Sequence, residues 1–325
     1  MYLDFVWSKG IFFRNKYMLL ENTTKPSEDY IINQILNDSN IIWIRSNIKR
    51  YKNKDIDFFA NNITLLSKDV IIITADSDLS IPSSFSFKSV LTILNNKFVK
   101  KWYTQNYDKS IIHEKFSYYP IGLDLHTKRW LIGNDPTKKI KYIIKVRFMN
   151  IDRIDNKIFC DTHLRITHNE RKIMYDEIKN NIRISFLENL YGFNKIILKY
   201  RFHKLVISPI GNGLDCHRTW ELFLLGCIVV TKSSSLDQMW IDNKLPVVII
   251  NDWFDLNFNL KTKIKLWINK YEKYTDFDYI FNKFKNSYWI NSKKSNIENI
   301  ILNNDNIVNN DNIVNNDNIV NNDNI

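Results

Sequence analysis

Short runs of β-branched residues alternate with amphipathic segments along most of the chain. In the first half, the apolar runs NIIWI (40–44) and DVIIIT (69–74) predict strands, and the segments 28–38 and 56–66 predict helices before and between them. Strands that alternate with helices are typical of parallel sheets with helices on both faces. The pattern therefore predicts an α/β fold.

The second half repeats this alternation and then becomes wholly helical. Strands are predicted at five apolar runs: YIIKVRF (142–148), IRISF (182–186), KLVISP (204–209), CIVVT (227–231) and PVVII (246–250). Helices are predicted at 169–181, 216–226, 235–240, 260–274 and 277–290. A polar stretch with two turn signals, GNDPTKKIK (133–141), is the predicted linker between the two α/β units.

The C-terminal segment Asn303–Ile325 repeats the sequence NNDNIV. Each repeat carries a single Ile–Val pair, which is too little apolar surface to offset the conformational entropy of an ordered chain. We expect disorder here, with a hexapeptide β-helix as the structured alternative. The expected division is an N-terminal domain at 1–137, a C-terminal domain with terminal helices at 138–302, and the tail at 303–325.

Charge and apolar content limit the classes of function. The formal net charge is +11, and because the tail contributes −4, the remaining residues carry +15. The lysines are scattered, which fits a solvated lysine-rich surface as well as a groove for a polyanion. Helix-turn-helix, zinc-finger and ribonucleoprotein signatures are absent from the sequence, so no nucleic-acid partner is expected.

The remaining composition predicts a protein of the cytoplasm. The longest apolar runs fall short of the ~20 residues that cross a bilayer, and Met1–Phe13 lacks the pattern of a signal peptide. Three cysteines, an odd number, fit a reducing compartment. The scattered Cys and His residues match no familiar zinc-ligand spacing, so no metal site is expected.

The stretch Ser208–Thr231 (SPIGNGLDCHRTWELFLLGCIVVT) carries the densest candidate chemistry. A predicted strand leads into the loop Gly211-Asn212-Gly213, and Asp215 is the predicted N-cap of the helix 216–226. Ligands of open α/β sheets bind at the carboxyl ends of strands, and the N–H groups at a helix start favour an anion. The loop is neither the dinucleotide fingerprint nor a P-loop, because the required glycine and Gly-Lys-Ser/Thr are missing.

Arg218 and Glu221 share one face of this predicted helix. Their spacing suits a ligand with a diphosphate at one end and sugar hydroxyls at the other. It also fits an ordinary surface ion pair beside a glycine turn, worth about 0.3 kcal/mol.

The same stretch, followed by LPVVIINDW (245–253), resembles the C-terminal signature of exostosin-like (family 47 type) glycosyltransferases. That signature runs from a strand through a Gly-rich turn to Arg, Glu and Gly-Cys-Ile, and closes on a Pro-Val-Val-Ile strand with Asp-Trp. The segments ITADSDLSIP (73–82), WYTQNYD (102–108) and YYPIGLDLHT (118–127) resemble the N-terminal half of such proteins. The resemblance covers most of the chain outside the tail.

This resemblance implies a GT-B architecture, in which two Rossmann-like domains face a cleft. The C-terminal domain would hold a nucleoside diphosphate sugar, and the N-terminal domain would present a hydroxyl of a glycan, glycoprotein or glycolipid acceptor. The implied reaction is an inverting sugar transfer without a metal or other cofactor. Arg218 would contact the donor diphosphate and Glu221 the donor hydroxyls, most of all those of the ribose. The other implied donor-binding residues are Gly211, Asn212, Gly213, Asp215 and His217.

An inverting transfer also needs a base on the acceptor side. The candidates are Asp76, Asp124 and His126, and we favour Asp76 because it follows the carboxyl end of a predicted strand. Asp76-Ser77-Asp78 also fits a simple turn cap, and His126 also fits a phosphate contact. Two other classes stay open: a carbohydrate- or nucleotide-binding module without turnover, and a basic nucleic-acid-binding protein.

Overall fold

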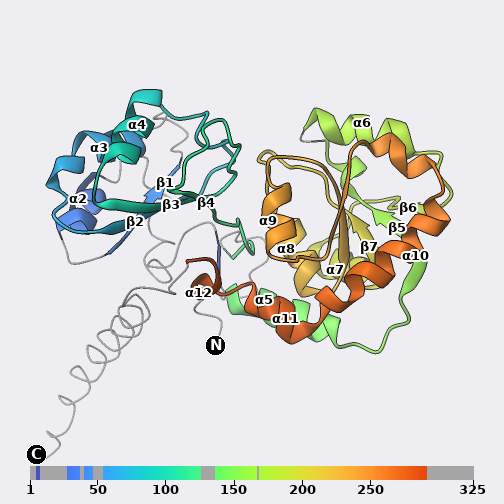
Figure 1. Cartoon of the computed structure of the whole chain (residues 1–325). Helices are drawn as coiled ribbons and strands as arrows, with labels where there is room; N and C mark the ends of the chain where they lie inside the picture. Colours follow the sequence, from blue (N-terminus) through green and yellow to red (C-terminus); the bar gives the residue numbers. More distant parts are fainter. Residues whose placement is uncertain are drawn as a thin grey trace, which may run out of the picture.

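A computed structural model describes residues 5–7, 28–36, 40–46, 54–125, 136–166 and 168–290. The chain forms an α/β fold with one four-stranded and one five-stranded sheet, both wholly parallel (Figure 1). The predicted α/β class is therefore confirmed. The predicted tail (303–325), the start of the predicted linker (133–135) and His126 lie outside the described residues.

The first sheet has the order β1-β2-β3-β4. Its strands are β1 (Ile41–Arg45), β2 (Val70–Ala75), β3 (Val99–Thr104) and β4 (Phe116–Tyr118). Helices α2 (Glu28–Leu36), α3 (Lys54–Asn61) and α4 (Phe87–Asn95), with the short η1 (Ile63–Leu65), accompany these strands. Alternate strand residues face two cores, because successive side chains point to opposite faces. Ile42 and Ile72 join the core that includes residues of α2 to α4, whereas Trp43 and Ile73 join a core shared with the second half.

The second sheet has the order β6-β5-β7-β8-β9. Its strands are β5 (Ile154–Cys160), β6 (Ile184–Phe186), β7 (His203–Ile207), β8 (Ile228–Lys232) and β9 (Val247–Ile250). They are connected by η3 (Thr162–Leu164), α6 (Asn169–Ile178), α7 (Phe193–Arg201), α8 (His217–Leu224) and α9 (Asp237–Asp242). The strand order reverses between β5 and β7, and ligands of such sheets bind beyond the carboxyl ends of the strands at this reversal.

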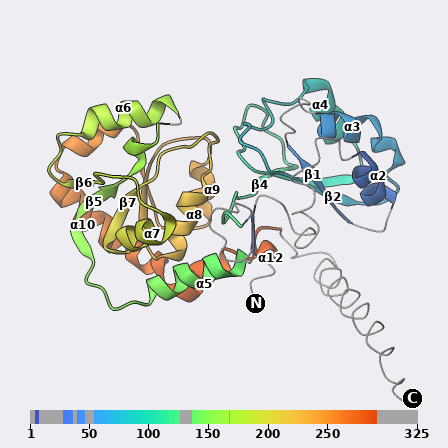
Figure 2. The ribbon, with the colours of Figure 1, turned by 180° about the vertical axis from the view of Figure 1, so that it is seen from behind.

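The remaining elements precede or follow the second sheet in the chain. They are α5 (Pro136–Arg147), η4 (Trp253–Asn257), α10 (Leu260–Tyr271), η5 (Glu272–Thr275), α11 (Phe277–Asn282) and α12 (Asn286–Trp289). Figure 2 shows α12 between the two halves from behind, as Figure 1 does from the front. The Tyr119 hydroxyl donates to Asn286 Oδ1 at 2.6 Å, and Trp289 packs against Trp220. None of the helices in the described ranges has both the length and the apolar character needed to span a bilayer.

One predicted strand is wrong, and it lies at 142–148 inside α5. The buried apolar residues of this helix are spaced by three, at Ile140, Ile143 and Val146, which is helical spacing that the β-branched composition obscured. The strand lies later in the chain, at β5. Its first four residues are exposed and mostly polar, and only its last three are buried, so its sequence lacks the apolar run that predicts a strand. The predicted domain boundary at 137/138 falls inside the first turn of α5. Sequence analysis also missed α4, β3, β4 and α7.

The segment Phe5–Trp7 inserts between residues that are far apart in the sequence. Val6 N donates to Phe284 O at 2.7 Å, and Trp7 forms a bridge with Gly122. Gly122 has φ 64°, and a Cβ atom built on it would lie 2.0 Å from Val6 O. Only glycine fits this position, because both the backbone conformation and the close approach exclude a side chain.

We expect Gly122→Ala to lower the free energy of unfolding by at least about 2 kcal/mol, from backbone strain and from displacement of the Val6 carbonyl. Gly192→Ala is the matched control, because a Cβ atom there meets nothing within 4 Å, and it should cost less than about 1 kcal/mol. Urea denaturation of both variants measures the difference. Equal stability of the two variants would contradict the role of Gly122.

Candidate functional site

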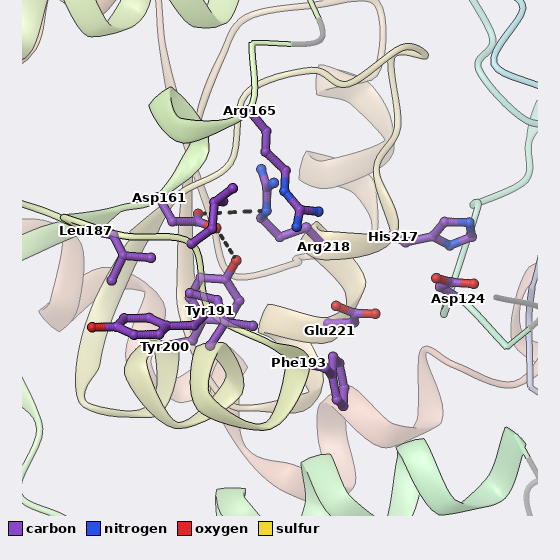
Figure 3. Close-up of a pocket in the computed structure, with 12 residues that line it drawn as sticks. Asp124, Asp161, Arg165, Leu187, Tyr191, Phe193, Tyr200, His217, Arg218 and Glu221 are labelled. Atoms are coloured by element: carbon purple, nitrogen blue, oxygen red, sulfur yellow. Dashed lines mark hydrogen bonds and ion pairs between the residues drawn. The ribbon is translucent and has the colours of Figure 1, made fainter. Parts of the chain in front are cut away.

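A cavity of about 210 Å³ lies at the carboxyl ends of β5 and β7, where the strand order reverses. Asp161 directly follows β5, and α8, which follows β7, contributes His217, Arg218 and Glu221. Asp124, from the first half of the chain, closes one end (Figure 3). The cavity therefore lies where the topology of the second sheet predicts a ligand, and residues of both halves line it.

One end of the cavity is rich in arginine. Arg218 and Arg165 lie side by side in Figure 3, and Arg218 Nε lies 3.9 Å from Asp161 Oδ1. The Tyr200 hydroxyl donates to the other oxygen of Asp161 at 2.8 Å. Burial lowers the pKa of Arg218, but Asp161, Tyr200 and Cys216 together more than offset this effect and raise the pKa above its ordinary value. Arg218 is therefore always charged.

Arg218 Nη1 is buried and has no hydrogen-bond partner among the described residues. An unsatisfied buried N–H on a charged group costs free energy, about 1–3 kcal/mol or more. Oxygen atoms of an anionic ligand would remove this cost, and the planar guanidinium group suits phosphate or carboxylate oxygens.

Arg171 supports this end from behind. Its Nε donates to Ile210 O at 3.1 Å and its Nη1 to Arg165 O at 3.0 Å, so it ties the loop after β7 to the segment after β5. Burial lowers the pKa of Arg171, and the charge of Arg218 lowers it further. This mutual repulsion means that an anion between the arginines would stabilise both.

The opposite end is built from carboxylates that share one lysine. Lys139 Nζ lies 2.6 Å from Glu221 Oε1 and 3.6 Å from Asp124 Oδ2, and it also donates to Asp124 O at 2.9 Å. The Lys139 side chain is only 2% exposed. In Figure 3, Glu221, Asp124 and His217 lie away from Arg165 and Asp161. The arginine end therefore has two arginines to one carboxylate, whereas this end has two carboxylates to one lysine.

A third part of the cavity wall is apolar. Leu187, Tyr191, Phe193 and Ile196 come from the segment after β6 and from α7. The Phe193 ring lies 5.1 Å from Lys139 Nζ, within cation–π distance. A ligand in this cavity therefore contacts apolar and aromatic surface as well as charge.

Four of the sequence-predicted site residues meet in this cavity: Asp124, His217, Arg218 and Glu221. His217 Nδ1 is 2.8 Å from Gly122 O, so this side chain also joins α8 to the first half. The residues that line the cavity do not include the glycine loop, Asp215 or Asp76.

The glycine loop packs against protein. A Cβ atom on Gly211 would lie 2.7 Å from Cys216 Sγ, and one on Gly213 would lie 2.8 Å from Asn106 Nδ2. Gly211 N donates to Gly213 O at 3.0 Å, and Asn212 is exposed. Gly213 thus permits a close approach between the halves of the chain, and Gly211 permits one between the loop and Cys216. A phosphate contact by this loop stays a prediction.

Asp215 is not the N-cap of α8, so that prediction is wrong. Cys216 occupies the N-cap position, and the buried Asp215 carboxylate accepts from Cys216 N at 2.8 Å, Trp220 Nε1 at 3.0 Å and Ile121 N at 2.8 Å. Asp215 N donates in turn to Asn106 Oδ1 at 2.8 Å. Asp215 therefore connects the start of α8 to two loops of the first half.

Asp76 lies just beyond β2 with φ 65°. Its N–H donates to Gln105 Oε1 at 3.1 Å, and the same turn approaches the glycine loop, since Asp78 O lies 3.1 Å from a Cβ atom built on Gly213. The proposed base therefore lies where the halves meet but outside the cavity lining.

Sequence analysis missed Lys139, Asp161 and Tyr200, and for Arg165 it favoured a helix-surface position over the cleft-facing one that the structure shows. Asp161 follows the carboxyl end of a strand, which is the signal that selected Asp76, but β5 itself was not recognised. Lys139 was assigned to the linker. Within the part of the chain that the structure describes, no group of three or more His, Cys, Asp or Glu residues is arranged to hold a metal ion.

Asp215 gives a pH-dependent test of this junction. Burial raises its pKa from 3.8 to about 7, although the N–H groups of Ile121, Trp220 and Cys216 favour the charged form. Between these values the unfolded chain loses the proton and the folded protein keeps it, so stability is lost as the pH rises. We expect the free energy of unfolding of the wild type, relative to Asp215→Asn, to fall by about 1.4 kcal/mol per pH unit in this window. Urea denaturation from pH 4 to 8 measures it, and a difference that rises with pH would show that the hydrogen bonds dominate.

No protein-family model and no curated protein matches the chain. The resemblance to exostosin-like glycosyltransferases therefore depends on the sequence motifs, chiefly those at 208–231 and 245–253, and a family assignment is a proposal.

Proposed function

We propose that the protein is a GT-B glycosyltransferase that transfers a sugar from a nucleoside diphosphate sugar to a hydroxyl acceptor. The observation that carries this proposal is Arg218, whose buried Nη1 lacks a partner in the described residues and which lies beside Arg165 at the strand-order reversal. Two parallel sheets and a cavity lined from both halves of the chain are compatible with the GT-B arrangement.

The arginine end suits the diphosphate. Sugar transfer expels a nucleoside diphosphate, so negative charge grows on its oxygens in the transition state. Fixed positive charge at that position lowers the barrier. Arg218 and Arg165 supply such charge, together with the N-terminal end of the α8 dipole, which supports transfer without a bound metal ion.

The carboxylate end suits hydroxyl groups. Glu221 lies one turn beyond Arg218 on α8, and carboxylate oxygens accept hydrogen bonds from sugar or ribose hydroxyls. The cavity of about 210 Å³ is below the ~300–1,000 Å³ of pockets that enclose a whole drug-sized ligand. The diphosphate and one adjoining ring would fill it, and the rest of the donor would extend outward.

The acceptor base is proposed to be Asp76. Asp124 lines the cavity, but Lys139 lies 3.6 Å from its carboxylate, and a nearby cation makes a carboxylate a weaker base. Asp76 lies at the carboxyl end of β2, beside the junction of the two halves. His126, the remaining candidate, is outside the described residues.

Arg218→Ala should weaken nucleoside diphosphate binding by about 1.5–3 kcal/mol, the contribution of a hydrogen bond to a charged group. Arg183→Ala is the control, because Arg183 directly precedes β6 and so lies at the amino end of the parallel strands, whereas the cavity lies at their carboxyl ends. Calorimetric titration with UDP and GDP measures both variants. Unchanged affinity in a folded Arg218→Ala protein would exclude the proposed diphosphate site.

Asp76→Asn should lower turnover by ~10²–10⁴-fold and leave donor affinity nearly unchanged, because a base acts on the acceptor proton in the transition state. Asp69→Asn, at the amino end of β2, is the control. Donor hydrolysis and transfer are measured with UDP- and GDP-sugars. Wild-type turnover in Asp76→Asn would reduce Asp76 to a turn residue, and donor binding without any turnover by the wild type would favour a binding module.

A further inference from the structure

We propose that Lys139 is a positioning residue, which orients Glu221 so that one of its oxygens receives hydroxyl groups of the ligand. The inference rests on the proposed function and extends it to a residue from α5. Lys139 is not among the cavity-lining residues, whereas Glu221 and Asp124, its two carboxylate partners, both line the cavity. The cation therefore lies behind the carboxylates and not in the ligand's place.

The geometry assigns different roles to the two oxygens of Glu221. Oε1 lies 2.6 Å from Lys139 Nζ, a short charge-assisted contact that holds this oxygen in place. Glu221 itself lines the cavity, and its side chain is 12% exposed. A carboxylate held by one oxygen presents the other as a fixed acceptor, which suits a hydroxyl group of a ribose or sugar ring.

The burial of Lys139 argues that this contact serves more than stability. Its side chain is 2% exposed, and it is enclosed by the Phe193 ring as well as by the two carboxylates. Burying charges is costly, and well-packed apolar residues often stabilise a protein as well as a buried ion pair does. What the ion pair adds is a fixed orientation, which matters at a binding site because ligand contacts require accurate placement.

Lys139 also sets the relation between the two carboxylates. Asp124 belongs to the first half of the chain, while Lys139 and Glu221 belong to α5 and α8 of the second. Without a cation between them, Asp124 and Glu221 would repel each other. We therefore expect removal of the lysine charge to turn Glu221 away from its position, with little effect on the arginine end.

The test compares two probes that use different parts of the cavity. Inorganic pyrophosphate needs only the arginine end, whereas UDP or GDP, whichever binds the wild type better, also offers ribose hydroxyls. Lys139→Met removes the charge and keeps the chain length. It should lower nucleoside diphosphate affinity about 10-fold and change pyrophosphate affinity less than about 2-fold. Lys141→Met, at an exposed position of α5, is the control and should change neither affinity.

A double-mutant cycle shows whether Lys139 acts through Glu221. Glu221→Gln should produce a similar selective loss, and Lys139→Met combined with Glu221→Gln should be no worse than either change alone, because residues that act as one unit are not additive. Lys139→Arg keeps the buried charge and serves if Lys139→Met fails to fold. It should show the same selective loss, because a guanidinium group cannot reproduce the single-point contact at Oε1.

The outcomes separate the positioning role from the proposed function. Equal loss of pyrophosphate and nucleotide binding in the lysine variants, additive effects in the double mutant, or no loss at all would overturn the positioning role of Lys139 and leave the diphosphate site intact. Failure of the wild type to bind pyrophosphate, UDP and GDP would overturn the proposed function, and this inference with it.

Discussion

The arrangement of the site depends on one buried carboxylate. Asp215 accepts the N–H of Ile121 from the first half of the chain and the N–H groups of Cys216 and Trp220 from the start of α8. A buried carboxylate must be fully hydrogen-bonded to be tolerated, so these loops are held in one arrangement. The orientation of α8, and with it the direction of Arg218 and Glu221, follows from this constraint.

One turn of α8 contributes a cation to one part of the cavity and a carboxylate to another. Arg218 and Glu221 are three residues apart on α8, so both lie on the face that lines the cavity. Arg218 contacts Asp161, whereas Glu221 contacts Lys139. Each charged group has a partner of opposite sign on one side and the cavity on the other. This separation is what a ligand with an anionic part and a polyhydroxyl part would require, and it is the physical basis for the proposed donor site.

Local patterns were sufficient to predict most of the second sheet and the helix that carries the site. The runs at 204–209, 227–231 and 246–250 are apolar and bounded by turn residues, so they form β7, β8 and β9 as predicted. Arg218 and Glu221 could be selected because they follow such a strand within one continuous segment. Where sequence and fold agree locally, the prediction holds.

The errors arise where a residue's role is set by distant parts of the chain. Lys139 belongs to the site only because α5 places it behind Glu221, although the two residues are 82 positions apart in the sequence. Gly211 and Gly213 have the composition of an anion loop, but Cys216 and Asn106 occupy the space that their missing side chains leave. Burial in β5 is likewise decided by its neighbours, since its first four residues are exposed and its last three are buried. Its mostly polar first residues therefore concealed the strand.

The contact between Val6 and Phe284 also limits when the protein can finish folding. Ribosomes synthesise a chain from its N-terminus, and N-terminal domains generally fold first. Here, one hydrophobic core includes Phe5 together with Phe284, Trp289 and Ile290. The first described residues therefore reach their final position only after nearly all of the fold has been synthesised, and until then the apolar face of the first sheet that carries Trp43 and Ile73 lacks its cover. Apolar surface that is exposed during synthesis is prone to aggregation.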